Sequence, residues 1–149
     1  MEHTHDMLTH GVNIVTAAHD GKRAGLAVAW ATQVGTDHVL VCIGKQSHTR
    51  ELILASRAFG LSVLAADQLD VSKRFGLQSS RKVDKFEGLG THTLETGSPL
   101  LDDCALALDC RVAAVHEHGT ARLIVGEIVA AERIRESCEP LLYRESDYS

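Results

Sequence analysis

The sequence has little of what marks several specialised protein classes. Its 149 residues include two prolines and 4% aromatic residues. No apolar run approaches the roughly 20 residues that span a bilayer, and residues 1–6 lack the basic start and apolar core of a signal peptide. We therefore expect a cytoplasmic protein with a single domain over residues 1–149, in which residues 1–8 are disordered.

Positive charge and closely spaced cysteines are also scarce. The net charge of −5 argues against a nucleic-acid partner, because binding to phosphate backbones needs a basic surface. The four cysteines lack C-x-x-C spacing, which excludes a zinc ribbon or an iron–sulfur cluster as a local motif. Cys42 and Cys110 lie among apolar residues and are predicted core residues. Cys138 as a nucleophile is a less favoured alternative.

Metal-binding and acid–base patterns are missing as well. The nine histidines include a group near the N-terminus and a pair before the last strand, namely His3, His5 and His10 with Asp6, and His116 with His118. Neither group shows H-E-x-x-H or another cage-like spacing, so we expect no metal. No Ser-His-Asp order or paired-carboxylate pattern stands out, so we expect no catalytic side chain. Any chemistry must then come from a cofactor.

Alternation and turn residues predict a mainly β fold with a few short helices. Asp20-Gly21 is a strong hairpin signal between residues 12–17 and 24–29. Further strands are expected over residues 38–43, 61–64, 104–115 and 121–134, with helices over 49–58 and 67–75. Gly76 is the predicted left-handed stop of the second helix, and residues 77–97 form a long ordered loop.

The last predicted hairpin is too apolar for a sheet with one solvated face. Residues 123–131 carry apolar side chains at nearly every position, so both faces need cover. A second sheet layer covers one face in an antiparallel barrel, and a partner subunit covers the other. We expect a homodimer, with a monomeric barrel that buries the whole hairpin as the alternative.

The most informative segment is the corner that follows the apolar strand of residues 39–43. There Gly44, Lys45, Ser47 and Thr49 lead into a helix, which places free N–H groups, hydroxyls and a charge around one point. Such a point suits a phosphate, although an N-cap is the commonest role of a serine like Ser47. Small residues over 25–34 allow a flat ring to lie against the backbone. The pattern suggests a phosphorylated, planar cofactor.

The order and spacing of the segments resemble the flavin reductase-like proteins, which have an FMN-binding split β-barrel with Greek-key-like antiparallel strands. The similarity extends over nearly the whole chain, in residues 11–16, 25–34, 42–49, 59–64, 81–86, 97–101, 107–110, 124–129 and 139–143. Relatives of this kind include flavoredoxin, the flavin domain of high-molecular-weight rubredoxin and the reductase components of two-component monooxygenases. The resemblance implies FMN as cofactor and a dimer with flavin sites near its interface.

The resemblance also implies which residues hold FMN. The isoalloxazine ring would lie along the backbone of Ala29, Trp30, Ala31, Thr32, Gln33 and Val34, and the phosphate at Gly44, Lys45, Ser47, His48 and Thr49. Lys85 would reach the phosphate or the ring, with Asp84 orienting it. Trp30 either stacks on the cofactor or lies in the core.

The implied activity is electron transfer through FMN, from NAD(P)H or a redox protein to an acceptor. Many resembling reductases have a histidine near the nicotinamide, where this chain has Thr120 and Ala121. This difference favours, as an alternative, an electron carrier like flavoredoxin without NAD(P)H activity. A non-enzymatic split-barrel module that binds a cofactor is the third possibility.

Overall fold

The computed structural model describes residues 7–44, 47–80 and 82–148, and its main feature is one curled antiparallel sheet. Seven strands follow the order β2-β1-β5-β8-β9-β4-β3. Their bounds are β1 Asn13–His19, β2 Lys22–Val28, β3 Ala31–Val34, β4 His38–Gly44, β5 Ala58–Val63, β8 Leu106–His118 and β9 Ala121–Arg133. This architecture confirms the predicted fold class.

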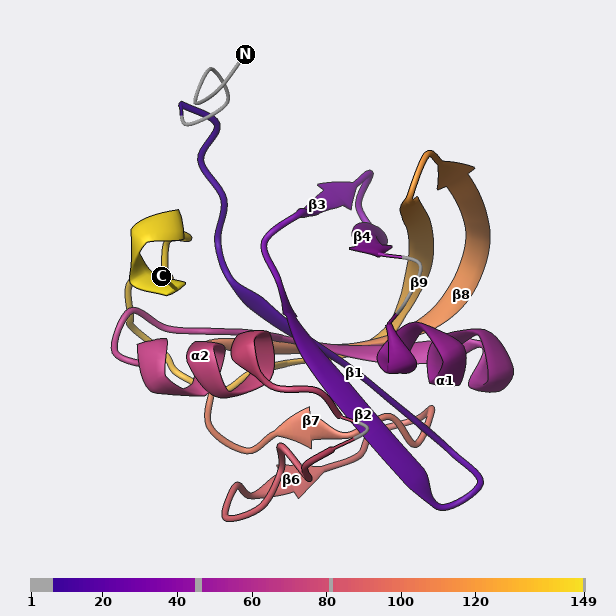
Figure 1. The fold of residues 1–149 in the computed structure, drawn as a ribbon, viewed down its shortest axis with the longest axis horizontal. Helices are drawn as coiled ribbons and strands as arrows, with labels where there is room; N and C mark the ends of the chain where they lie inside the picture. Colours follow the sequence, from indigo (N-terminus) through magenta and orange to yellow (C-terminus); the bar gives the residue numbers. More distant parts are fainter. Residues whose placement is uncertain (1–6, 45–46, 81, 149) are drawn as a thin grey trace.

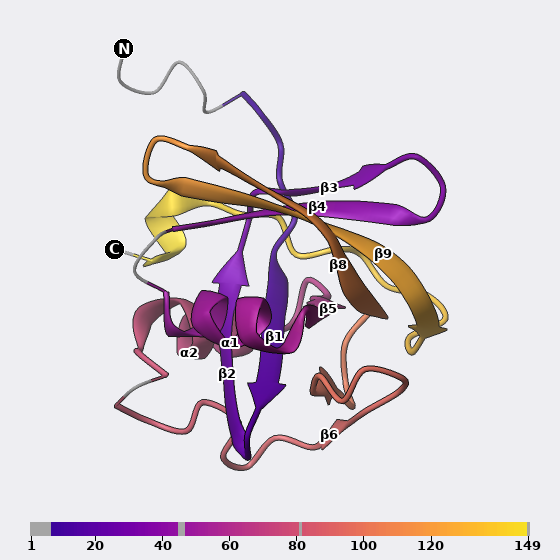
Figure 2. The same cartoon turned by 90° about the vertical axis from the view of Figure 1, so that its right-hand side faces the viewer.

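Smaller elements surround this sheet, as Figures 1 and 2 show. A two-stranded ribbon pairs β6 Thr91–His92 with β7 Leu100–Leu101. The helices are α1 His48–Ser56 and α2 Leu69–Leu77, and the chain ends in the 3-10 helix η1 Glu145–Tyr148. None of these described helices is long and apolar enough to cross a membrane.

The first hairpin forms as its turn residues predict. Asp20 and Gly21 take left-handed φ values of 51° and 75°, which the two central residues of a tight hairpin need. The strands on either side pair in continuous register from Asn13 with Val28 to His19 with Lys22. The Asp-Gly dipeptide therefore sets the register of β1 and β2.

The long hairpin of β8 and β9 bends the sheet into a barrel (Figure 2). Its register shifts twice, between Asp109 and Cys110 and between Val112 and Ala114. Such bulges bend a strand and increase its twist. At the bend Gly126 leaves room for the ring of Phe59, because a Cβ at Gly126 would lie 2.5 Å from that ring.

The sheet buries apolar side chains on two sides. Inside the barrel lies one cluster, to which α1 contributes Leu52 and Ile53 at one end. The second cluster fills the space between the sheet and the layer of α2 and residues 84–104, with Phe75 and Phe86 ring to ring at 5.2 Å. Among the described strands the ladder does not close between β2 and β3, so the barrel is split there.

Three details differ from the sequence-based expectations. Gly76 lies inside α2 rather than ending it, and its φ is not left-handed. Lys85 donates to the Phe75 carbonyl at 2.7 Å, so a lysine side chain provides the hydrogen bond to a carbonyl in the last turn of α2. In a helix that ends at a left-handed glycine, backbone N–H groups provide such bonds. Cys42 is half-buried rather than in the core, because it faces outward from β4. The strand expected over residues 104–115 runs from Leu106 to His118 instead.

Candidate functional site

The predicted phosphate corner is the start of α1. Ser47 is the N-cap: its Oγ accepts a hydrogen bond from the Arg50 N–H at 3.2 Å, and its backbone is extended. The N–H groups of His48 and Thr49, the first two residues of α1, have no carbonyl acceptor within the helix, because the first N–H groups of any helix lack one. They add the positive end of the helix dipole to this corner. Lys45, also predicted here, lies outside the described residues.

A cavity of about 180 Å³ opens at this corner. Its walls come from the start of α1, the middle of β2, and α2 with the loop after it, and consist of Gly25, Leu26, Ser47, His48, Thr49, Phe75, Gln78, Ser79, Ser80 and Lys85. Within the described ranges the lining thus holds four hydroxyl side chains, one amine and no carboxylate. The structure brings together four of the predicted phosphate residues: Ser47, His48 and Thr49 are consecutive, and Lys85 joins them from a distant loop.

Lys85 lies deep in this wall, with 4% of its surface exposed. Its Nζ donates to the carbonyl oxygens of Gly25 at 2.8 Å and Phe75 at 2.7 Å. Burial lowers the pKa of Lys85 to about 8. A protonated amine has three N–H donors, so one donor remains for a ligand after these two bonds. The side chain can therefore supply one directed positive charge.

Asp84 does not orient Lys85, contrary to the prediction. Its carboxylate accepts from the Phe86 N–H at 3.0 Å and lies 3.4 Å from the guanidinium of Arg23. The orienting groups of Lys85 are backbone carbonyls instead, which no side-chain pattern in the sequence marks.

The loop carrying Lys85 is fixed to β2 at Gly25. The Ser80 hydroxyl both accepts from the Gly25 N–H at 3.3 Å and donates to the Gly25 carbonyl at 3.1 Å. A Cβ at Gly25 would lie 2.8 Å from the Phe75 ring, so only glycine allows this close approach. Ser80 was not predicted, and a serine in a polar loop carries no signal that would single it out.

The predicted ring segment forms the link from β2 into β3, at the free edge of the sheet. Trp30 is 62% exposed, which rules out its place in the core and leaves the stacking alternative. The Trp30 carbonyl accepts from the Cys42 N–H at 2.9 Å. Since successive residues of an antiparallel strand alternate in direction, Ala31 and Gln33 turn their N–H groups away from β4. The Ala31 N–H bonds to the Ala29 carbonyl at 3.0 Å.

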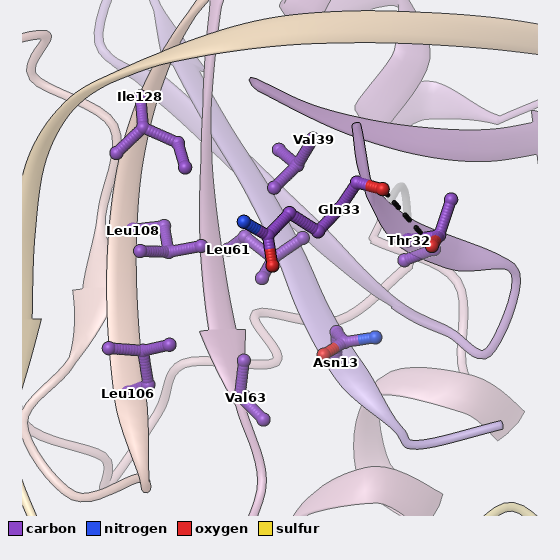
Figure 3. A pocket seen from close by; sticks show the side chains of 10 residues that line it. Asn13, Thr32, Gln33, Val39, Leu61, Val63, Leu106, Leu108 and Ile128 are labelled. Carbon is purple, nitrogen blue, oxygen red and sulfur yellow. Dashed lines mark hydrogen bonds between the residues drawn. The ribbon is translucent and has the colours of Figure 1, made fainter. Parts of the chain in front are cut away.

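A second cavity, of about 360 Å³, lies under β3 at the end of the barrel (Figure 3). It is lined by Asn13, Ala31, Thr32, Gln33, Val39, Leu61, Val63, Leu106, Leu108 and Ile128. Figure 3 shows the Gln33 side chain reaching over the apolar wall, while the Thr32 side chain points away from it. The predicted ring residues Ala31, Thr32 and Gln33 therefore line this cavity and not the phosphate corner.

Asn13 is the polar residue of this lining that sequence reasoning missed. It is 8% exposed, and its Nδ2 donates to the Val28 carbonyl at 3.2 Å. The sequence did contain a signal for Asn13, because it is the one polar residue among Val12, Ile14 and Val15. Side chains alternate between the two faces of a strand, so Asn13 shares the face of Val15, which points into the barrel.

Four predicted residues in the described part of the chain line neither cavity, namely Ala29, Trp30, Val34 and Gly44. Val34 lies on the outer side of β3 and is 43% exposed. Gly44 ends β4 opposite Ala121 of β9. All four are close in sequence to residues that do line a cavity, and their contact with a cofactor stays a prediction.

The donor set suits a phosphorylated planar group. Helix-end N–H groups, hydroxyls and one amine meet at the smaller cavity, and this is the set that binds phosphate in proteins. A strand edge with the small side chains of Ala29 and Ala31 and the outward N–H group of Gln33 leads from there to the larger cavity. The two features match the two ends of a phosphorylated ring compound.

Comparisons with known proteins agree with this reading. The model of the flavin reductase like domain matches residues 5–149. The FMN reductase (NADH) RutF 2 of Rhizobium rhizogenes is 34% identical over 92% of this chain and 79% of its own length. The flavin-dependent monooxygenase reductase subunit HsaB of Mycobacterium tuberculosis is 32% identical over 93% and 74%. The crystal structure of flavoredoxin from Methanosarcina acetivorans superposes with a TM-score of 0.87 at 27% identity, over 96% and 84%.

Proposed function

The chain belongs to the flavin reductase-like family and is an FMN-binding flavin oxidoreductase, and we propose that it reduces FMN with NAD(P)H and passes the electrons to a second acceptor. The observation that carries the proposal is the meeting of the α1 N-terminus with Lys85 at one cavity. FMN, when bound, supplies a ring that accepts a hydride and gives up its electrons again. The protein supplies binding and orientation.

The phosphate is held at the start of α1. Ser47 and Thr49 contribute hydroxyls and helix-end N–H groups, and the remaining donor of Lys85 supplies charge. Charge-assisted hydrogen bonds of this kind are the strong ones. Because Lys85 and Ser80 both bond to Gly25, the loop after α2 is fixed in place before the ligand arrives. That arrangement reduces the ordering cost of binding.

The ring lies along the link from β2 into β3. The outward N–H group of Gln33 offers a hydrogen bond to the polar edge of the ring, and the small side chains of Ala29 and Ala31 allow close approach. Trp30, exposed beside them, offers an aromatic face. Backbone donors at a flavin carbonyl favour the reduced, anionic ring and so raise its potential.

A flavoredoxin-like electron carrier without NAD(P)H activity is the second candidate. The specific observation is Ala121 at the start of β9, where the resembling reductases have a histidine near the nicotinamide. Across the hairpin tip, however, His118 pairs with Ala121, so an imidazole does stand at this end of the ladder. This pairing is one reason for placing NAD(P)H first.

We also propose a homodimer that covers the outer face of β4 and β9. Val39, Val41 and Ile43 point into the barrel and are buried, so Leu40 and Cys42 point outward. Their neighbours on that face include Leu123, which pairs with Cys42. In the single chain these outward side chains are only half-buried. Leu40→Glu should convert the dimer to a monomer in light scattering after size exclusion; an unchanged mass would place the interface elsewhere.

The experiment for the reaction is an absorbance spectrum of the protein with added FMN, after desalting and then after anaerobic NADH or NADPH. Retained flavin bands that bleach within seconds support the NAD(P)H-dependent reductase. Bands that persist under both nucleotides support the electron carrier. A protein that retains no flavin, and does not speed the reduction of free FMN, contradicts both.

A further inference from the structure

The larger cavity occupies the end of the barrel opposite α1. Helix α1 follows Gly44 and covers the end where Ile43 lies, whereas Val39, at the other end of β4, lines the cavity. Its remaining walls come from β5, β8 and β9, through Leu61, Leu106 and Ile128 among others. The volume of about 360 Å³ is at the small end of the range for ligand sites, roughly 300–1,000 Å³. It has room for a compact molecule of one or two rings.

Among the residues that the structure describes, the lining of this cavity carries no charged side chain. Apart from two carboxamides and Thr32, every lining residue is apolar. Bringing an ion into such a site costs far more than bringing in a neutral molecule, because nothing there replaces its hydration. The lining therefore disfavours nucleotides and carboxylates and selects neutral ligands. The smaller cavity at α1, with its amine and hydroxyls, has the opposite preference.

The two carboxamides supply directed polarity. Asn13 and Gln33 each make one side-chain hydrogen bond within the described structure, both through an N–H: Asn13 to the Val28 carbonyl, and Gln33 to the Gly35 carbonyl at 2.8 Å. Each keeps a second N–H donor and a carbonyl acceptor. Asn13 is more than nine-tenths buried on a wall that is otherwise apolar. A carboxamide can donate to a carbonyl and accept from a hydroxyl at the same position.

We propose that this cavity binds the electron acceptor, a neutral ring compound of the quinone class. The same two carboxamides fit a quinone carbonyl before reduction and a hydroquinone hydroxyl after it. Ala31 and Thr32 belong both to this lining and to the proposed flavin segment, which places the acceptor beside the flavin. The acceptor role rests on the proposed function. NAD(P)H supplies a hydride and solvent one proton, so that the quinone gains two electrons and two protons and NAD(P)⁺ is released.

The test measures binding before activity. Duroquinone is a suitable probe because its four methyl groups prevent addition of the half-buried thiols of Cys42 and Cys138. Its binding is followed by equilibrium dialysis, with the flavin-free protein and with the FMN-loaded protein. FMN retention is read separately from flavin absorbance, so a failure of the proposed function and a failure of this inference give different signals.

Two variants test the location. Leu106→Trp fills the cavity and should weaken duroquinone binding more than tenfold, whereas Leu8→Trp, the same change at a 65% exposed position, should not alter it. Gln33→Leu, on the exposed edge strand, should weaken binding about two- to tenfold through loss of one hydrogen bond. This second variant preserves the test if Leu106→Trp does not fold.

The outcomes separate clearly. Binding to both protein forms, lost in Leu106→Trp and reduced in Gln33→Leu, supports the proposal. Displacement of duroquinone by FMN overturns it, because the cavity would then hold the flavin ring itself. The absence of binding to a protein that retains FMN also overturns it. Binding of duroquinone by a protein that retains no FMN removes the acceptor role together with the proposed function.

Discussion

Replacing Lys85 with methionine removes the single amine from the proposed phosphate site. At pH 7 the lysine is mostly protonated, since its pKa is about 8, and two of its donors are used by carbonyl oxygens. A hydrogen bond to a charged partner contributes about 1.5–3 kcal/mol. We therefore expect Lys85→Met to weaken FMN binding roughly 10- to 100-fold at pH 7, measured by quenching of flavin fluorescence.

The pH dependence is a sharper test than the affinity alone. Burial lowers the pKa of Lys85, so in the free protein the amine loses its proton near pH 8. Above that pH, FMN binding must be accompanied by proton uptake, and the dissociation constant should rise up to about tenfold per pH unit. The phosphate itself stays doubly charged, because its second pKa is about 6. The methionine variant should show no such rise between pH 7 and 9.5.

Stability provides the control for folding. In the variant the Phe75 carbonyl loses its side-chain donor, while the Gly25 carbonyl keeps that of Ser80. An unsatisfied buried acceptor costs about 1–3 kcal/mol, which urea denaturation measures. Lys82→Met, an exposed lysine in the same loop, should change neither quantity. If Lys85→Met binds FMN as tightly as the wild type with the same pH dependence, the assignment of Lys85 to the phosphate is wrong.

Three further substitutions test separate parts of the structure. Ser47→Asp keeps an N-cap acceptor, so the urea midpoint should stay nearly unchanged. The FMN dissociation constant should rise, because the new carboxylate repels the phosphate. If stability and FMN affinity instead fall together, the role of Ser47 is purely structural. Partial burial lowers the pKa of His92, but its bonds to Asp102 and Glu132, at 2.6 and 2.7 Å, outweigh this and raise it. Because the pKa is raised, the stabilisation by these two ion pairs is complete below the unfolded pKa of about 6.5 and is lost as the pH rises through the folded pKa. The difference in unfolding free energy between wild type and His92→Gln should therefore shrink as the pH rises. A difference that stays constant from pH 5 to 8.5 would contradict this. Asp109→Ala removes the carboxylate that accepts from the backbone N–H groups of Glu95 and Thr96, at 2.7 and 2.8 Å, in a partly buried site. The substitution should cost about 3 kcal/mol or more in urea denaturation, and a loss below about 1 kcal/mol would mean that water replaces the carboxylate.

Local signals in the sequence were sufficient for the fold. Asp20-Gly21 fixes the first turn and thereby the register of two strands, and the apolar run before Gly44 marks β4. The last hairpin followed from two long apolar segments separated by a polar stretch around Gly119. These features act over a few residues, so they can be read along the chain. The resemblance to the flavin reductase-like family then supplied the split-barrel architecture.

The details of the site depended on contacts that are distant in sequence. Lys85 bonds to Gly25, which lies 60 residues away in the sequence. Lys85 also bonds to the end of α2, where the sequence predicted a left-handed Gly76 as the helix stop. Asp84 looked like its partner because it is adjacent, yet the two have different partners. Side-chain pairing in a loop is decided by what packs against that loop, and the sequence of the loop does not contain this information.

The two cavities divide the binding of a redox pair by charge. The corner at α1 offers an amine, hydroxyls and helix-end N–H groups, so it favours the charged phosphate end of a cofactor. The cavity at the other end of the barrel offers apolar walls with two carboxamides, so it favours a neutral ring. The link of Ala29 and Trp30 joins the strands that contribute to each. If both sites are used as proposed, the flavin ring lies between a charged anchor and a neutral acceptor, and exchange of acceptors need not disturb the anchor. Lys85→Met and Leu106→Trp should then affect FMN and duroquinone independently, with the double variant showing the sum of the two free-energy changes.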